Sequence, residues 1–174
     1  AGATVQDARA FDRVVAFDQA LGILECEAGA TLDKVFRVAA PRGWYLPVQA
    51  GYPRITIGGC IAADAHGKNQ FRDGNFSRQV ESLRLFHPGH GVVIADRERR
   101  AELLDLTCGG LGLTGHILSA RLRLARLPGH RVRVRRTRIA RLEDTPALLE
   151  AEAARAAFLY TWQNLTVRGD TLGR

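Results

Sequence analysis

The sequence contains no methionine, only three scattered cysteines and no long apolar run, and each shortage narrows the class of protein. No segment comes near the roughly 18 consecutive apolar residues of a membrane-spanning helix. Cys26, Cys60 and Cys108 form no CxxC pair and are odd in number, so we expect buried, inert thiols in a reducing, cytoplasmic setting. The first residues carry no secretory signal. The lack of methionine, even at position 1, indicates that these residues belong to a longer protein.

Arginine is in excess in one part of the chain. The 174 residues carry 25 basic and 18 acidic side chains, a formal net charge of +7. Residues 121–141 hold nine arginines and no acid, so the rest of the chain carries 25 − 9 = 16 basic against 18 acidic residues, a net of −2. The length and the 46% of hydrophobic residues fit one domain with a sizeable core.

Hydrophobic periodicity predicts an α+β fold that is built from hairpins. Alternation and turn residues predict two strand pairs, residues 13–17 with 23–28 and residues 80–86 with 91–95. Helical spacing predicts three helices, over residues 32–40 behind an N-capping Thr31, over 102–106 and over 143–157. Further strands are expected at residues 44–48, 117–127, 131–142 and 158–165.

Two glycine-rich stretches are the candidates for chemistry, residues 51–74 and 108–117. Glycine implies that backbone comes close to another segment or to a ligand, and exposed N–H groups in such loops suit a pyrophosphate. A tight structural turn would explain the same glycines. Neither stretch is a Walker A loop. Residues 110–115 match GxGxxG, but they precede a predicted strand instead of following one, which excludes a Rossmann unit.

His66 lies between Asp64 and Lys68, and on an extended backbone these three side chains would share a face. Such a row could serve acid–base chemistry, although a structural histidine is the simpler interpretation. The histidines show no metal-ligand spacing, and no serine nucleophile elbow is present. We therefore expect no metal site, and the catalytic residue stays unknown.

Three segments resemble a known family: residues 55–69 (ITIGGCIAADAHGKN), 73–76 (DGNF) and 109–115 (GGLGLTG). They are similar to the FAD-linked oxidases of the vanillyl-alcohol oxidase (PCMH-type) superfamily, most of all to the branch of decaprenylphosphoryl-β-D-ribose 2′-oxidase and the sugar-lactone oxidases. The resemblance implies an FAD-binding domain over residues 1–127, without its N-terminal phosphate-loop segment. It also implies the beginning of a substrate (cap) domain over residues 128–174.

The resemblance further implies non-covalent FAD and oxidation of a secondary alcohol, sugar or polyol-like, by hydride transfer to flavin N5. The electron acceptor stays open. The cofactor-binding positions that it assigns are Gly51, Thr56, Ile57, Gly58, Gly59, Ala63, Asp64, Ala65, His66 and Ile117. The first five would approach the pyrophosphate and ribityl chain, and the next four would line the flavin. Lys68 is assigned to the substrate pocket.

The chain departs from the family pattern in ways that affect function. The Arg-Gly-x-Gly-x-Ser-like phosphate loop is absent, and Gln70 and Phe71 stand where the branch usually has two histidines. This chain alone is therefore expected to be inactive and to bind FAD weakly. A non-catalytic or degenerate flavin-domain fragment is one alternative, and a basic nucleic-acid-binding module is another. In residues 121–141 arginine alternates with aliphatic residues and not with aromatic ones, which disfavours nucleic acid and favours a domain junction or a peripheral contact with membrane headgroups.

Overall fold

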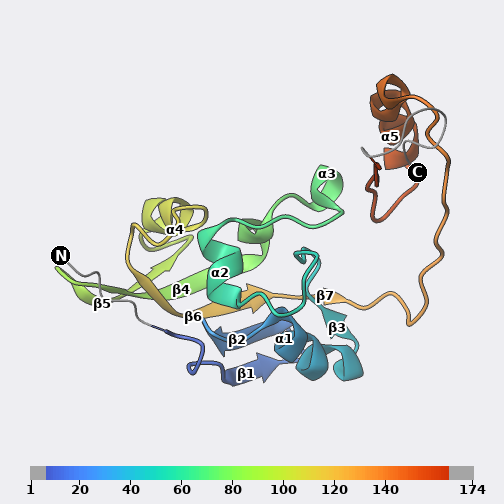
Figure 1. Cartoon of the computed structure of the whole chain (residues 1–174). Coiled ribbons are helices and arrows are strands. Elements are labelled where there is room, and N and C mark those ends of the chain that lie inside the picture. Colours follow the sequence, from blue (N-terminus) through green and yellow to red (C-terminus); the bar gives the residue numbers. More distant parts are fainter. Residues whose placement is uncertain (1–6, 165–174) are drawn as a thin grey trace.

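A five-stranded antiparallel sheet lies at the centre of the structure, a computed structural model that describes residues 7–164 (Figure 1). Its strands follow the order β1-β2-β6-β4-β5. Their bounds are β1 (Val14–Asp18), β2 (Ile23–Glu27), β6 (His116–Arg123), β4 (Val80–His87) and β5 (Gly91–Asp96). The two hairpins predicted from the sequence are confirmed, and β6 joins them because it pairs with both β2 and β4.

Helices cover one face of this sheet. They are α1 (Leu32–Ala39), α2 (Ile57–Ala62) and α4 (Ala101–Thr107). The side chains that point from the sheet into the shared core alternate along the strands, and they are Leu24, Cys26, Leu83, Leu85, Ala95, Ala120 and Leu122. On the opposite face, Arg84, Phe86 and Ile94 are exposed, so the described chain packs its sheet on one face only.

Helix α1 begins where the sequence predicts. The Thr31 hydroxyl accepts a hydrogen bond from the Lys34 N–H at 3.2 Å, which satisfies one of the free donors of the first turn. Leu32, Val35 and Ala39 then face the core. The chain continues through a 3₁₀ turn, η1 (Ala40–Arg42), and a short strand, β3 (Trp44–Tyr45).

The expected strand at residues 117–127 is divided in two. The second part is β7 (Ala125–Arg126), which leaves the main sheet and pairs with β3. At the break, the Leu124 N–H donates to the Gly22 carbonyl at 2.7 Å, which ties the end of β6 to the first hairpin turn. The Arg126 guanidinium then lies 4.0 Å from the centre of the Trp44 ring.

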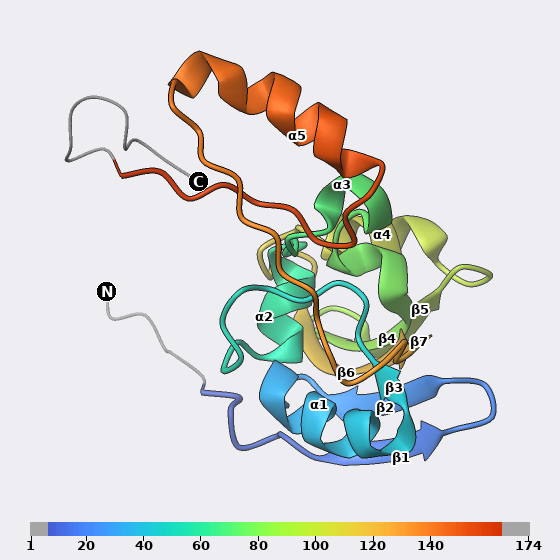
Figure 2. The same ribbon diagram turned by 90° about the vertical axis from the view of Figure 1, so that its right-hand side faces the viewer.

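The sequence-based prediction of strands at residues 131–142 and 158–165 is wrong for the residues that the structure describes, which end at 164. The first of these segments leaves the sheet and runs out in an irregular, exposed path (Figures 1 and 2). A strand needs a neighbour to take its backbone hydrogen bonds. Among the described residues, 131–137 have no such neighbour, although their alternating pattern is typical of a strand.

The predicted C-terminal helix forms as a 3₁₀ turn, η3 (Leu142–Asp144), followed by α5 (Thr145–Ala153). Two further short elements follow α2: α3 (Gln70–Asp73) and the 3₁₀ turn η2 (Phe76–Gln79). After α5 the chain turns back towards α3, and both views show this return (Figures 1 and 2). The Leu159 N–H donates to the Lys68 carbonyl at 2.7 Å, so the C-terminal part meets the main body at Lys68.

Candidate functional site

The first glycine-rich stretch enters the fold at the N-terminus of α2. Thr56 is the N-cap residue, and its hydroxyl accepts from the Gly59 N–H at 3.1 Å. The next two amides dock onto the end of β2: the Ile57 N–H donates to the Ala30 carbonyl at 2.7 Å, and the Gly58 N–H to the Ala28 carbonyl at 2.8 Å. These contacts hold α2 against the sheet.

The structure explains some of these glycines by packing and leaves others unexplained. A Cβ on Gly58 would lie 3.0 Å from the Ala28 Cβ and 3.1 Å from its carbonyl oxygen, so glycine lets α2 approach the strand. Gly51 is different, because it is exposed and a Cβ there would meet nothing within 4 Å. The amides of Ile57, Gly58 and Gly59 have protein acceptors. Among the described residues, no acceptor faces the N–H groups of Gly51 and Thr56.

The second glycine-rich stretch lies beside the first, as a shared ligand site requires. The Gly109 N–H donates to the Ile61 carbonyl and the Leu111 N–H to the Ala62 carbonyl, both at 2.9 Å. The loop exposes two leucines, Leu111 at 75% and Leu113 at 90%. Large apolar side chains with so much exposed surface next to a strip of small residues form a wall suited to a flat, partly apolar group.

Small side chains continue along the exposed side of α2. Gly59 and the C-capping Ala63 are exposed, and Ala65 is half-buried. Ile117, which the resemblance assigned to the cofactor, is 7% exposed and lies opposite Leu85. It therefore offers a ligand little surface.

Asp64 shapes the turn after α2. Its φ of 41° lies in the left-handed region, which Asp tolerates better than most residues. One carboxylate oxygen accepts from the Ser77 N–H at 2.8 Å and the other from Asn75 Nδ2 at 3.1 Å. The left-handed turn breaks the extended backbone on which Asp64, His66 and Lys68 would share a face, so no such row forms.

His66 and Lys68 are exposed at either side of the buried Gly67. His66 Nδ1 lies 3.4 Å from the Gly67 carbonyl oxygen. A Cβ on Gly67 would meet the Gln49 carbonyl oxygen at 2.8 Å, so glycine there lets the loop lie against residues 46–50. The Lys68 ammonium is 3.8 Å from the centre of the Tyr160 ring.

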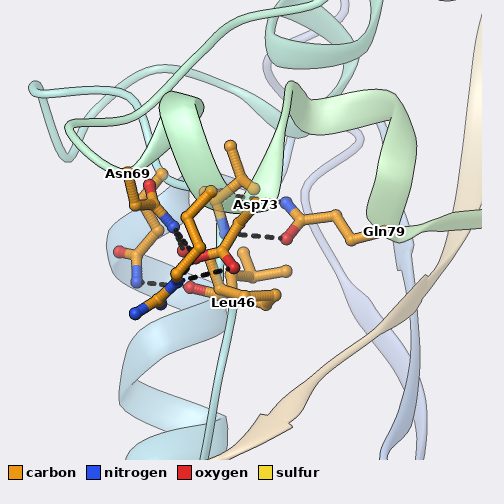
Figure 3. A network of polar contacts seen from close by, with 8 residues as sticks. Leu46, Asn69, Asp73 and Gln79 are labelled. Carbon is orange, nitrogen blue, oxygen red and sulfur yellow. Dashed lines mark hydrogen bonds and ion pairs between the residues drawn. The ribbon is translucent and has the colours of Figure 1, made fainter. Parts of the chain in front are cut away.

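A polar network beneath Lys68 was not found from the sequence (Figure 3). Asn69 is 1% exposed, and its Nδ2 donates to the Pro47 carbonyl at 2.8 Å and to Asp73 Oδ2 at 2.6 Å. Gln79, at 3% exposure, accepts from the Val48 N–H and donates to the Val48 carbonyl. In the sequence this network is represented only by two amide residues, Asn69 and Gln79, in a segment that is partly buried. Their spacing is not distinctive, so it could not predict the network.

Charge within this network is compensated locally. The Arg72 guanidinium donates to both oxygens of Asp73, and this contact, together with the Asn69 amide, lowers the pKa of the Asp73 carboxyl below its ordinary value. The loop that carries Lys68 is thus fixed from below by two buried amides and one ion pair.

The three cysteines fit the prediction of inert thiols. All are free, Cys26 and Cys60 are buried, and Cys108 is half-buried. Burial raises the pKa of Cys26 and Cys60 to about 12 and that of Cys108 to about 11. Within residues 7–164, no group of three His, Cys, Asp or Glu residues could hold a metal ion, and no helix is long and apolar enough to cross a membrane.

Several arginines of the basic stretch have partners within the protein. Arg123 pairs with Glu81 at 2.5 Å, and Arg135 pairs with Glu152. Arg141 lies 3.5 Å from Glu143, and Arg126 covers Trp44. The stretch is therefore less available to a polyanion than its composition suggests.

Comparisons with known proteins agree with the α+β architecture, and the family match includes the first glycine-rich stretch. The family described as FAD binding domain matches residues 1–95, more than half of the chain. The chain belongs to this family of FAD-binding domains in the PCMH-type oxidase superfamily.

Three relatives illustrate the likeness. An "Uncharacterized protein in mprA 5'region" of Streptomyces coelicolor is 35% identical over 144 residues, which cover 83% of this chain and 39% of the relative. The "Decaprenylphosphoryl-beta-D-ribose oxidase" of Mycolicibacterium smegmatis is 34% identical over 125 residues, 71% of this chain and 27% of the relative. A "Probable D-2-hydroxyglutarate dehydrogenase, mitochondrial" of Oryza sativa subsp. indica is 33% identical over 86 residues, which cover 49% of this chain and 14% of the relative. The chain thus spans well under half the length of these relatives.

Proposed function

We propose that this chain forms one wall of an FAD site in an oxidoreductase that acts on CH–OH groups. The observation that carries the proposal is Gly51, whose lack of a side chain neither packing nor backbone conformation requires. It lies in the loop that leads to α2, and its N–H group and that of Thr56 have no acceptor among the described residues. Free backbone donors beside small residues suit a pyrophosphate.

We assign roles to the residues as follows. Gly51 and Thr56 donate to the cofactor phosphates, and Gly59 and Ala63 leave room along α2 for the rest of the molecule. Ile57 and Gly58 act indirectly, because their amides hold α2 against β2. Asp64 and Ala65 fix the turn that presents His66 to the flavin side. Ile117 supports the second glycine-rich loop from the core.

FAD, held without a covalent bond, would supply hydride acceptance at N5 from a secondary alcohol carbon. The chain's own residues bind the cofactor and the substrate and orient them. Lys68 keeps a positive charge at the exposed end of the loop, where it can receive an alcohol oxygen or an anionic group of a sugar or polyol-like substrate. The apolar Leu111 and Leu113 exclude water from one side of the site. We assign no proton acceptor to the described residues.

We further propose that residues 1–127 are the FAD-binding domain and that residues 128–174 begin a substrate domain. The extended exit of the chain after β7 supports this division. The chain covers 39% or less of each relative, so we expect the 174 residues alone to bind FAD weakly and to turn over no substrate.

Titration of the purified chain with FAD tests the proposal. Saturable perturbation of the flavin visible band is expected, and Gly51→Val should weaken binding at least about tenfold because its branched side chain fills the open space. Gly129→Val is the matched control, since a Cβ at Gly129 also meets nothing within 4 Å and this residue lies outside the site. Absence of FAD binding, or equal binding by both variants, would refute the proposal.

A further inference from the structure

Lys68 differs from the other lysine of the chain in its partner. Lys34 and Lys68 are the only lysines in the sequence. Lys34 forms an ion pair with Asp12 at 2.7 Å. Lys68 forms no ion pair with any of the described residues, and its ammonium lies 3.8 Å from the centre of the Tyr160 ring.

The acids nearest to Lys68 in the sequence are engaged elsewhere. Both oxygens of Asp64 accept from the 75–77 turn, and both oxygens of Asp73 accept from Arg72. The Lys68 charge is therefore not cancelled by a carboxylate. An aromatic face attracts an ammonium through its quadrupole but carries no net charge, so it can orient the group without neutralising it.

The backbone holds this pair together. The Leu159 N–H donates to the Lys68 carbonyl at 2.7 Å, which places the next residue, Tyr160, against the lysine. From the other side, Asn69 and Gly67 are buried and fix the lysine backbone. Tyr160 remains 61% exposed as a residue, so the pair is open to a ligand.

From these contacts we infer that Tyr160 is a positioning residue that aims the Lys68 ammonium at an oxyanion of the substrate. The inference rests on the proposed function and deepens it, because it makes the segment after α5 part of the same site. It also narrows the substrate class to an alcohol that carries a phosphate or carboxylate group. A ring-oriented cation has less conformational freedom to lose when the anion binds.

Lysine-selective ¹³C labelling of the whole chain gives a direct test, because only two Cε signals appear and Lys34→Arg assigns them. The Lys68 Hε signal is expected upfield from ring current. Tyr160→Leu should abolish that shift, and Tyr160→Phe should retain it. Phe158→Leu, an exposed aromatic residue two positions away, is the matched control and should change nothing. A Lys68 signal that is the same in the wild type and in Tyr160→Leu would overturn the inference.

Inorganic phosphate then serves as the anion probe. We expect it to perturb the Lys68 signal in the wild type and to bind about two- to fivefold more weakly to Tyr160→Leu, with affinity restored in Tyr160→Phe. No response of wild-type Lys68 to phosphate, or equal affinity in the leucine variant, would overturn the inference. These experiments contain no flavin, so failure of FAD binding in every variant would remove the proposed function while leaving this result intact.

Discussion

At the scale of single residues, glycines that look alike in the sequence have different causes. Gly58 is required by the contact between α2 and Ala28, whereas a Cβ on Gly51 would meet nothing within 4 Å. From the sequence alone, the close neighbour of each glycine could be either another chain segment or a ligand. In the structure the close neighbour is a chain segment for Gly58 and for Gly67. No chain segment lies close to the Cβ position of Gly51, and our proposal assigns that space to a ligand.

This difference predicts that a larger side chain destabilises the protein at Gly58 but not at Gly51. Gly58→Val should lower the free energy of unfolding by about 1–3 kcal/mol, because its side chain overpacks the Ala28 contact. Gly51→Val should leave it within about 0.5 kcal/mol of the wild type. Urea unfolding followed by circular dichroism measures both. Equal losses would show that Gly51 also has a packing role, and the argument for a ligand there would fail.

At the scale of elements, the loop that carries Lys68 depends on a carboxylate clamp. Asp73 accepts from Arg72 and Asn69, and its pKa is lowered in the folded protein. A carboxyl group with a lowered folded-state pKa contributes stability above its ordinary value of 3.8, and this contribution is lost as the pH falls through the folded-state value. The clamp should therefore open in acid.

Comparison of the wild type with Asp73→Asn isolates this contribution from the other carboxylates. At neutral pH the variant is expected to be less stable, and the difference in unfolding free energy should shrink as the pH falls below 3.8. Chemical denaturation at a series of pH values from 7 to about 2.5 measures it. A difference that stays constant over this range would mean that the carboxylate charge contributes nothing to the clamp.

The elements that could be predicted from the sequence are those whose signals are local. The hairpins and α1 were predictable because alternation, turn residues and the Thr31 cap act locally. Helix α2 was not, since its six residues include two glycines and are too few to repeat a helical period, although Ile57, Cys60 and Ile61 share its buried side. Residues 131–137 have the pattern of a strand, but pattern alone supplies no partner, and within residues 7–164 no backbone hydrogen bond pairs them with a neighbour.

At the scale of the whole molecule, the family, the α+β class and the glycine-rich stretches were predictable from the sequence. The joining of the two stretches through Gly109 and Leu111 was not, because it depends on contacts between segments about 50 residues apart. The net charge of +7 is concentrated in a stretch whose partners include Glu81, Glu152 and the Trp44 ring. The composition alone therefore overstates how far this basic stretch could serve as a binding surface for polyanions.

The central claim is that FAD lies along the exposed side of α2, between the loop at Gly51 and the loop at Leu111. The most direct test is a ¹⁵N correlation spectrum of the labelled chain recorded with increasing FAD. Shifts are expected at the amides of Gly51, Thr56, Gly59, Ala63 and Leu111, with residues 131–137 unchanged. Shifts confined to the arginines of residues 121–141, or no shifts at saturating FAD, would contradict the central claim.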